Sequence, residues 1–390
     1  MKRQLSALAV LASAALVGAA VASPAAAQTP NPSRTLTGLS APTGVAIGPA
    51  GEKYVANLNA GTVSIFDPGS TTPNPAKTLT GLVAPVGVAV DSVGHAYVTN
   101  GFGTTVSVFD PGATTATAAK TLIGLSMPSG VAIDSAHRIY VTNYGGGANT
   151  VSVFDPGVTT ANPALTLTGL NGPFGIAIDP TDHVYVTNFL GVVGAVSVYE
   201  PGSTTRNPAK TLTGLASPTA VAFDSTHHVY VTNFNSGSGT MVSVFEPAAT
   251  VANPARTLTG LYVPLGVAVG ASDRVYVTNF GSGPPGSTVS VFDPPVAKPG
   301  QAGKPTVKPK AHGKAKIKWA AAAANGEAPS YLLQVSSPGK VWKTVTTTSA
   351  TKFVGKIPKA KHGRTLWFRV IASNSAGSGP ASAVRSAVMK

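Results

Sequence analysis

The residues that could do acid–base or metal chemistry in this 390-residue chain recur at regular spacing and do not meet in one motif. One set of carboxylates follows a short apolar run: Asp91, Asp134, Asp179 and Asp224. A second set precedes proline: Asp67, Asp110, Asp155, Glu200, Glu246 and Asp293. Short carboxylates in such places accept hydrogen bonds from nearby backbone N–H groups and fix turns. We expect these carboxylates to be structural, because a single catalytic site would have to break the repetition.

The histidines test the idea of a metal or catalytic centre. His95, His183 and His228 stand two residues before a repeated tyrosine, and His137 and His227 stand one residue earlier in their copies. Equivalent residues on sheets stacked about 10 Å apart cannot all reach one metal, whose ligand bonds measure about 2 Å. We therefore expect a ring of exposed turn residues. The sequence also has no Cys, no nucleotide-binding glycine loop and no Ser/His/Asp order, so we predict no catalytic residue, no metal and no cofactor.

One sequence unit occurs six times between Arg34 and Pro295. It begins with Thr-Leu-Thr-Gly-Leu or a close variant, and successive copies start 43, 43, 45, 45 and 46 residues apart. The copies start at Thr35, Thr78, Thr121, Thr166, Thr211 and Thr257. A period of about 40 to 50 residues indicates a repeat architecture.

Each unit holds four short runs rich in β-branched residues, separated by Gly, Pro, Asp or Asn. We name the runs a (Gly-Val-Ala-Val), b (Tyr-Val-Thr-Asn), c (Val-Ser-Val-Phe) and d (Thr-Leu-Thr-Gly-Leu). Four antiparallel strands per unit are typical of a propeller blade, so we predict an all-β, six-bladed β-propeller. The first d run, residues 35–39, precedes the first a run, and no d run follows the last c run, which ends at Phe292. We expect residues 35–39 to complete the sixth blade and close the ring.

The fullest copy of the repeat, Pro85 to Asn100, resembles the NHL-type and YVTN-type β-propeller repeats. The resemblance extends over residues 34–295. It implies a family of mostly binding scaffolds, although some propellers with similar blades are lyases or lactonases. Fold similarity does not choose between binding and catalysis.

One face of the predicted ring is formed by the d–a connections and the b–c loops. All length variation lies there, because the b–c loops grow from five residues in the first two units to seven, seven, eight and nine in the others. An uncharged aromatic rim suits stacking on sugar rings or holding an apolar peptide. The alternative is that these side chains fill the wedges between blades. The candidate ligand-binding residues are Phe102, Tyr144, Phe174, Phe189, Leu190, Phe234, Leu265 and Phe280.

A second domain follows a basic Pro/Gly linker at residues 296–303. Its β-branched runs predict a β-sandwich. Trp319, Tyr331 and the run Phe-Arg-Val-Ile-Ala-Ser-Asn-Ser-Ala-Gly resemble a fibronectin type III domain over residues 304–390. The family's corner Tyr falls at Leu366, so that hydrogen bond is absent, and we expect Trp319 in the core.

Charge separates the two halves of the chain. Residues 296–390 hold 14 Lys and 3 Arg against Glu327 alone, whereas residues 28–295 hold 9 basic and 13 acidic residues. Because the positive charge is concentrated in residues 296–390, we expect this part of the chain to attract an anionic cell-wall or extracellular polymer. The candidate polyanion-binding residues are Lys304, Lys308, Lys310, Lys314, Lys316, Lys318, Lys356, Lys359, Lys361 and Arg364. The alternative is a merely soluble surface.

The first 27 residues read as a secretory signal, because Lys2 and Arg3 precede an apolar run that ends in small residues at Ala25 to Ala27. We therefore expect an exported protein, secreted or held at the cell surface, with no membrane span after removal of the signal and no nucleic acid partner. The predicted domains are 1–27 (signal), 28–295 (propeller), 296–303 (linker) and 304–390 (sandwich). We predict a non-catalytic binding protein; a propeller hydrolase or lyase acting on carbohydrate, with the sandwich as accessory module, is the alternative.

Overall fold

The computed structural model of the protein describes residues 32–190, 194–270, 273–281, 286–294, 299–324, 328–338, 340–358, 360–374 and 377–390. The predicted signal segment and the first three residues of the predicted linker lie outside these residues. The chain divides into two compact units, one ending at Asp293 and the other beginning at Pro294. Within the described ranges, no helix has the length and apolar character needed to cross a membrane.

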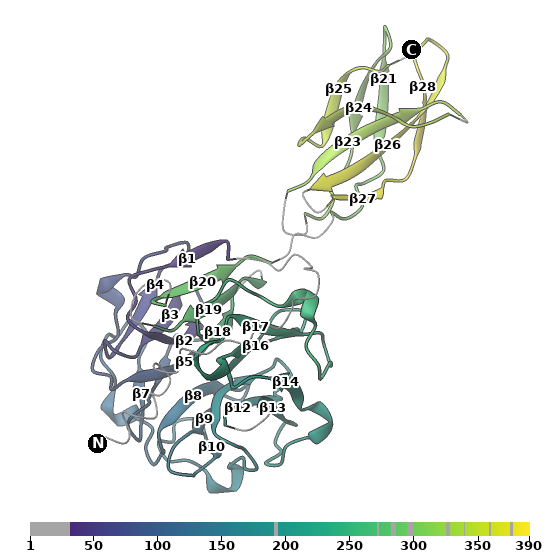
Figure 1. Ribbon diagram of the computed structural model, residues 1–390. Coiled ribbons are helices and arrows are strands. Elements are labelled where there is room, and N and C mark those ends of the chain that lie inside the picture. Colours follow the sequence, from purple (N-terminus) through teal and green to yellow (C-terminus); the bar gives the residue numbers. More distant parts are fainter. Residues whose placement is uncertain are drawn as a thin grey trace. The chain divides into compact units, whose positions relative to one another are not determined.

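The first unit consists of six small antiparallel sheets (Figure 1). Their a, b and c strands are β2 (Pro42–Ile47), β3 (Lys53–Asn57) and β4 (Thr62–Phe66); β5 (Pro85–Val90), β6 (Ala96–Asn100) and β7 (Val106–Phe109); β8 (Pro128–Ile133), β9 (Ile139–Asn143) and β10 (Thr150–Phe154); β11 (Pro173–Ile178), β12 (Val184–Asn188) and β13 (Gly194–Tyr199); β15 (Pro218–Phe223), β16 (Val229–Asn233) and β17 (Met241–Phe245); and β18 (Pro264–Val269), β19 (Val275–Asn279) and β20 (Thr288–Phe292). The a strands of successive sheets are neighbours, and β18 also contacts β2. The six sheets therefore close into the predicted six-bladed β-propeller.

The outer d strand is shorter than the sequence predicted. The d segment forms a strand in only two blades, as β1 (Arg34–Leu36) and β14 (Leu212–Leu215). In four blades the d segment makes a single bridge to strand c, as Leu79 does to Val63. The glycine of Thr-Leu-Thr-Gly-Leu has a positive φ in every copy, for example 78° at Gly81 and 74° at Gly214 within β14. Each d segment therefore needs a residue that tolerates the left-handed region.

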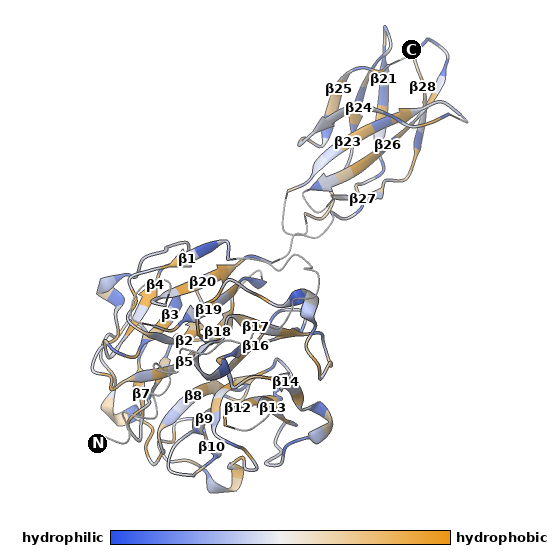
Figure 2. Cartoon of the chain, viewed as in Figure 1, coloured by the Kyte–Doolittle hydropathy of each residue, from blue (hydrophilic) through white to orange (hydrophobic). Residues whose placement is uncertain are grey.

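The ring closes as predicted, because β1 pairs with β20 of the last blade. Arg34 is opposite Val291, Thr35 is opposite Ser290, and Leu36 is opposite Val289. In Figure 2 the start of β1 is blue and β20 is orange, so the hydrophilic N-terminal strand covers the apolar outer edge of the sixth blade. A paired edge is protected from intermolecular strand addition.

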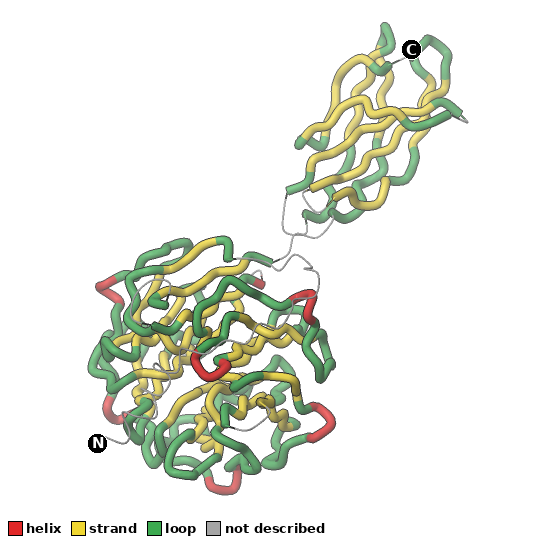
Figure 3. The backbone as a smooth tube through the Cα atoms, in the orientation of Figure 1, coloured by secondary structure: helices red, strands yellow, loops and turns green. Residues whose placement is uncertain are grey.

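The helical parts of the propeller are single 3-10 turns (red in Figure 3). They are η1 (Pro75–Lys77), η2 (Ala118–Lys120), η3 (Pro163–Leu165), η4 (Pro208–Lys210), η5 (Asn235–Gly237) and η6 (Pro254–Arg256). Four of them begin at the proline of an Asn-Pro sequence, and the side chains of Asn74, Asn162 and Asn207 each accept a hydrogen bond from a backbone N–H two residues later. Asparagine is a favoured cap, and proline fits the first helical position.

The hydrophobic cores of the propeller lie between the blades. One cluster joins the third and fourth blades, with Val151 and Val153 packed near Val184 and Tyr199, and every other pair of neighbouring blades has its own cluster. Each strand c ends in a buried aromatic ring: Phe66, Phe109, Phe154, Tyr199, Phe245 and Phe292. Large buried side chains dominate core energetics, so each blade is stabilised by its neighbours.

The second unit is a sandwich of two antiparallel sheets. One sheet has the order β21 (Thr306–Lys310), β22 (Lys314–Lys318), β25 (Lys352–Lys356), and the other contains β24 (Lys343–Thr348), β23 (Ser330–Ser336), β26 (Thr365–Asn374), β27 (Gly377–Ala381) and β28 (Arg385–Val388). Trp319 lies in the core as predicted, 6% exposed and 5.8 Å from the ring of Tyr331. Its core partners include Ile317, Leu333 and Phe368. The fibronectin type III resemblance stays a prediction.

Candidate functional site

The threonine of the Tyr-Val-Thr-Asn strand connects each blade to the next. In the second blade, the Thr99 hydroxyl accepts from the N–H of Gly87 at 2.7 Å and donates to the carbonyl of Ser129 in the third blade at 2.9 Å. Thr142, Thr187, Thr232 and Thr278 bond to the next blade in the same way. The first blade has Ala56 at this position and lacks the hydroxyl. The repeated threonine therefore holds the ring together at its axis.

A narrow channel of about 80 Å³ lies between the six a strands. Its lining residues come from the three positions after each proline, and they offer methyl groups, hydroxyls and backbone atoms but no carboxylate or imidazole. Small-molecule pockets usually measure about 300 to 1,000 Å³. The channel is therefore too narrow to hold a sugar or a peptide, and any such ligand must bind at one of the two faces of the ring.

Glycine in strand a allows the blades to approach closely at this channel. A Cβ added at Gly175 would lie 2.2 Å from the carbonyl oxygen of Thr219 in the next blade, and one at Gly266 would lie 2.3 Å from that of Thr43. Such contacts are not possible without movement of the backbone. The fifth blade has Ala220 instead. The glycines thus serve packing, and the channel is a structural element.

We call the side of the ring that carries the d–a connections and b–c loops the uncharged face. The repeated asparagine at the end of strand b fixes the d–a connections of this face. The Oδ1 atom of Asn100 accepts from the backbone N–H of Val83 in the d–a connection at 2.9 Å, and its Nδ2 group donates to Ser107 at 3.0 Å. The other five asparagines accept the same bond from their own d–a connections. The residue that donates this bond is thereby fixed on the uncharged face in every blade.

No Asp, Glu, Lys, Arg or His occurs in any of the loop sequences that form the uncharged face. These loops are residues 40–41, 58–62, 83–84, 101–105, 126–127, 144–150, 171–172, 189–195, 216–217, 234–241, 262–263 and 280–288. All charged residues from Glu52 to Asp293 lie in the a–b turns, in the c–d loops or at the strand ends beside them. We call that opposite side the charged face. The propeller is therefore strictly two-sided in charge.

Five of the predicted rim aromatics, Tyr144, Phe174, Phe189, Phe234 and Phe280, form one connected cluster on the uncharged face. The Tyr144 ring lies 5.6 Å from Phe174 and 5.9 Å from Phe189, and Phe189 lies 5.7 Å from Phe234, all between ring centroids. Phe234, Leu265 and Phe280 pack together with Ala41 and Val263. Edge-to-face aromatic pairs of this kind stabilise the fold beyond their buried area. The cluster therefore fixes the loops of the third to sixth blades against one another.

The predicted rim residues differ in their access to solvent. Phe102 and Leu190 are 37% and 47% exposed, and Tyr144 and Phe189 are half-buried. Phe174, Phe234, Leu265 and Phe280 are buried and fill the space between the blades. The burial of these four residues fits the wedge-filling alternative, and the other four are partly or largely exposed.

Sequence reasoning missed three exposed apolar residues on the same face. Tyr262 and Val83 are 47% and 59% exposed, and Met241 is 42% exposed. Tyr262 and Val83 occupy the position whose N–H is fixed by the repeated asparagine, two residues before the proline. The residue type at this position varies between blades, from Ser40 to Tyr262, and this variation was the sequence signal that could have identified these residues.

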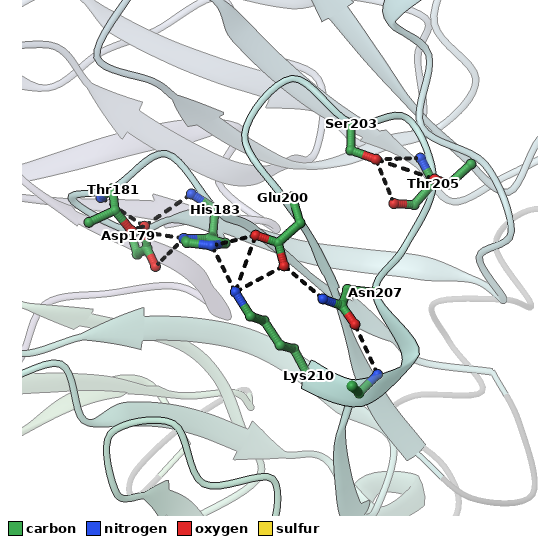
Figure 4. Close-up of polar contacts among 9 residues, drawn as sticks. Asp179, Thr181, His183, Glu200, Ser203, Thr205, Asn207 and Lys210 are labelled. Carbon is green, nitrogen blue, oxygen red and sulfur yellow. Dashed lines mark hydrogen bonds and ion pairs between the residues drawn. The ribbon is translucent and has the colours of Figure 1, made fainter.

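On the charged face, the prediction of exposed turn residues is wrong for His95, His183 and His228. His183 lies between two carboxylates, with its Nδ1 atom 3.2 Å from Asp179 and its Nε2 atom 2.9 Å from Glu200 (Figure 4). Lys210 contacts Glu200 at 2.9 Å. The hydrogen bonds from Lys210 and then Asn207 lower the pKa of Glu200 to about 2. His183 is thus one member of a charged row that runs from the a–b turn to the c–d loop.

The same row recurs in other blades. His228 is buried between Asp224 and Glu246, and His95 is half-buried beside Asp91. Arginine replaces histidine in two blades, where Arg138 pairs with Asp134 and Arg274 pairs with Asp293. The histidines at this position therefore contact carboxylates and are largely enclosed, contrary to the prediction of exposed turn residues, which holds only for His137 and His227.

A shallow basin of about 590 Å³ lies on the charged face, between the a–b turns of the third to sixth blades. Its carboxylates are Asp134, Asp179, Asp182, Asp224 and Asp273. Asp182 and Asp273 break the sixfold pattern, and each accepts two hydrogen bonds from a serine of the preceding blade, Ser135 or Ser225. The bonds from Ser135 lower the pKa of Asp182. Within the described part of the chain, no three His, Asp or Glu side chains are placed to hold a metal ion.

Most predicted polyanion-binding residues lie on the sandwich sheet β21–β22–β25 or at its ends. Lys308 and Lys310 are on β21, Lys314, Lys316 and Lys318 are on β22, and Lys356 is on β25. Lys304, Lys361 and Arg364 are exposed on the adjoining segments, and Lys359 lies outside the described residues. The sheet also presents Lys352, which the sequence reasoning missed.

Comparisons with known proteins agree with the propeller fold. No family model matches the chain, and no curated protein matches its sequence. A gluconolactonase from Xanthomonas campestris is 14% identical, with 72% of this chain and 99% of that chain covered and a TM-score of 0.51. An aldose sugar dehydrogenase from Streptomyces coelicolor is 16% identical over 67% and 97% of the two chains, with a TM-score of 0.48. A virginiamycin B lyase from Staphylococcus aureus is 13% identical over 66% and 98%, with a TM-score of 0.41. Identities this low show similarity of fold alone.

Proposed function

We propose that this chain is an exported binding protein whose propeller recognises a neutral carbohydrate on its uncharged face, while its basic sandwich attaches it to an anionic polymer of the cell surface. The observation that carries the proposal is the two-sided charge of the ring. A face with no charged side chain has no ionic interaction to offer, so its ligand must be held by apolar contact and hydrogen bonds.

The composition of the uncharged face favours a sugar over an apolar peptide. Phe102, Tyr262 and the half-buried pair Tyr144 and Phe189 offer ring surfaces. The b–c loops between them are rich in Thr, Ser, Asn and Gly, as in Gly-Phe-Gly-Thr-Thr at 101–105. Aromatic surface combined with neutral hydroxyl and amide groups suits a pyranose, which has apolar faces and a rim of hydroxyls.

Binding of a panel of neutral oligosaccharides to the chain from Gln28 to Lys390 tests this function. We expect Phe102→Ala and Tyr262→Ala each to weaken binding of the best oligosaccharide about tenfold, the scale expected when one aromatic ring no longer stacks on the sugar. Val93→Ala is the matched control, because Val93 is 63% exposed and lies on the charged face. Equal losses for all three variants, or binding of apolar peptides alone, would contradict the proposal.

The second candidate function is a propeller enzyme that acts on a carbohydrate. The names of the structural neighbours favour this alternative over a non-catalytic scaffold, since a gluconolactonase is among them. The basin on the charged face supplies carboxylates, and Asp182 and Asp273, which break the sixfold pattern, are the candidates for a general base.

Gluconolactone hydrolysis tests this candidate. Water adds to the lactone carbonyl, the ring ester bond breaks, and one proton is released per gluconate formed, which a pH indicator follows. An enzymatic function requires turnover above the uncatalysed rate that falls at least about a hundredfold in Asp182→Asn or Asp273→Asn, as for loss of a general base. Oligosaccharide binding without turnover would leave the binding function as the better account.

A further inference from the structure

The outer face of the β21–β22–β25 sheet is a lattice of lysines. Alternation along each strand points Ala315 and Ile317 of β22 into the core, both fully buried, and directs the lysines to solvent. Cross-strand register sets them in three rows, which are Lys310–Lys314–Lys356, Lys308–Lys316–Val354 and Thr306–Lys318–Lys352. Seven of these nine outward positions are lysine. We call these nine positions the lysine lattice.

The lysine lattice is unfavourable for folding. Lys308 is directly opposite Lys316, Lys310 opposite Lys314, Lys314 opposite Lys356, and Lys318 opposite Lys352. Like charges in opposed positions destabilise a sheet. The neighbouring charges, Lys318 and then Lys352 foremost, lower the pKa of the central Lys316. None of the ion pairs found among the described residues involves a lattice lysine, so none of these pairs relieves the repulsion.

We propose that the lysine lattice binds a linear polyol phosphate chain laid along the strands. This rests on, and makes more specific, the proposed attachment to an anionic polymer. Lysines two residues apart on one strand are about 6.7 Å apart, and neighbouring strands are about 4.8 Å apart. A flexible phosphodiester chain can place one phosphate on each lysine of β22, with the lysines of β21 and β25 on either side.

The side chains of the lattice favour a polymer of high charge density. Every cation in it is lysine, which binds an anion as a point charge, whereas arginine recognises a carboxylate or phosphate group at two points. The lattice thus responds to charge density and spacing more than to the shape of an anionic group. It is also flat, since its two other members, Thr306 and Val354, are small.

The lack of aromatic side chains in the lattice excludes polymers that need stacking. All residues of its three strands are described, and the only aromatic, Phe353, packs against the core of the sandwich. Single-stranded nucleic acids bind through bases stacked on aromatic rings, and sugar rings use the same kind of surface. A polyol phosphate has no ring to stack, and charge alone can hold it.

The test compares two triple variants that lose the same charge. The lattice variant is Lys308→Gln/Lys316→Gln/Lys352→Gln. The control is Lys340→Gln/Lys343→Gln/Arg385→Gln, which removes three exposed cations of the sandwich outside this sheet. The probes are synthetic poly(glycerol phosphate), polygalacturonate and oligo(dT), titrated onto the chain from Gln28 to Lys390. Thermal melting of each variant confirms that it is folded.

We expect poly(glycerol phosphate) to bind most tightly, and the lattice variant to lose about tenfold or more in affinity at low salt while the control loses less than about twofold. The slope of log affinity against log salt should fall by about 2 in the lattice variant, because each phosphate that is no longer neutralised contributes about 0.7 to the slope. Equal losses in the two variants would show that only total charge matters. Tighter binding of polygalacturonate or oligo(dT) would overturn the polyol phosphate assignment and leave attachment to an anionic polymer standing, whereas binding of no polyanion would refute both. Oligosaccharide binding at the uncharged face is measured separately and does not depend on either outcome.

Discussion

The hydroxyl of Thr278 donates to the carbonyl of Thr43 at 2.6 Å and joins residues 235 positions apart in the chain. The same hydroxyl accepts from the N–H of Gly266 at 2.7 Å. Thr43 and Thr278 are buried, and Thr43 and Gly266 line the channel at the axis of the ring. One side chain therefore connects the last blade to the first at the axis, while β1 connects them at the periphery.

Replacing that threonine should weaken ring closure. Thr278→Val keeps the shape of the side chain but leaves the Gly266 N–H and the Thr43 carbonyl without a partner, which costs about 1 to 3 kcal/mol for a buried group. Thr278→Ser retains the hydroxyl and should remain close to the parent. Urea unfolding of the three proteins measures the difference, and a valine variant as stable as the serine variant would exclude this role.

Removing β1 should open the ring at its periphery. A chain that begins at Thr37 lacks β1 and exposes the edge of β20, and it also loses the buried Leu36 from the core between the sixth and first blades. Loss of a buried leucine side chain alone costs about 2 to 5 kcal/mol. We expect a lower melting temperature and aggregation through the free edge. A chain that begins at Pro32 keeps β1 and serves as the control, so identical melting of the two truncations would show that β1 is dispensable.

The charged rows should make stability depend on acid pH. The folded-state pKa of Glu200 is about 2, below its ordinary value of 4.5. A lowered pKa means that the carboxylate stabilises the fold above about pH 4.5, and that this contribution disappears as the pH falls toward about 2. Glu200→Gln should therefore melt below the parent at neutral pH and match it near pH 2. A difference in melting temperature that stays constant over this range would contradict the lowered pKa.

Variants of the adjacent residues His227 and His228 test whether the histidines affect stability or ligand binding. His228→Asn removes the contacts to Asp224 and Glu246 from a buried position and should cost about 1 to 3 kcal/mol. His227→Asn changes an exposed side chain and should leave stability within about 0.5 kcal/mol. Both variants should bind oligosaccharide within about twofold of the parent, because the histidines are on the charged face. A hundredfold loss of binding or turnover in either variant would favour the enzyme candidate.

The propeller could be predicted because each sequence repeat of 43 to 46 residues contains the strands of one blade. The unmatched d run at 35–39 was enough to predict the pairing of β1 with β20. The role of the strand b threonine was not predictable in the same way, because Thr99 reads as an ordinary β-forming residue until the next blade places a carbonyl 2.9 Å from its hydroxyl. A hydrogen bond between neighbouring blades cannot be predicted from the sequence of a single repeat.

The site residues were harder to predict, because exposure depends on how loops fold over one another. Phe102 and Phe280 occupy comparable loops, yet one is 37% exposed and the other 8% exposed. Phe280 is buried because it packs with Phe234 and Leu265 of neighbouring segments. For the histidines, sequence spacing showed the turn but not the carboxylate that the c–d loop brings to it, as Glu200 is brought to His183.

The lining of the channel alternates around the ring. Thr43, Ser129 and Thr219 in the odd-numbered blades carry hydroxyls, and each bonds to the proline carbonyl of the next blade, whereas the even-numbered blades carry Val86, Phe174 and Leu265. Ser135 and Ser225 likewise reach from an odd blade to Asp182 and Asp273 of an even one. Alternation around a closed circle is possible only for an even number of members. Gain or loss of one blade would set two blades of the same kind side by side, so the structural repeat of the channel lining is a pair of blades.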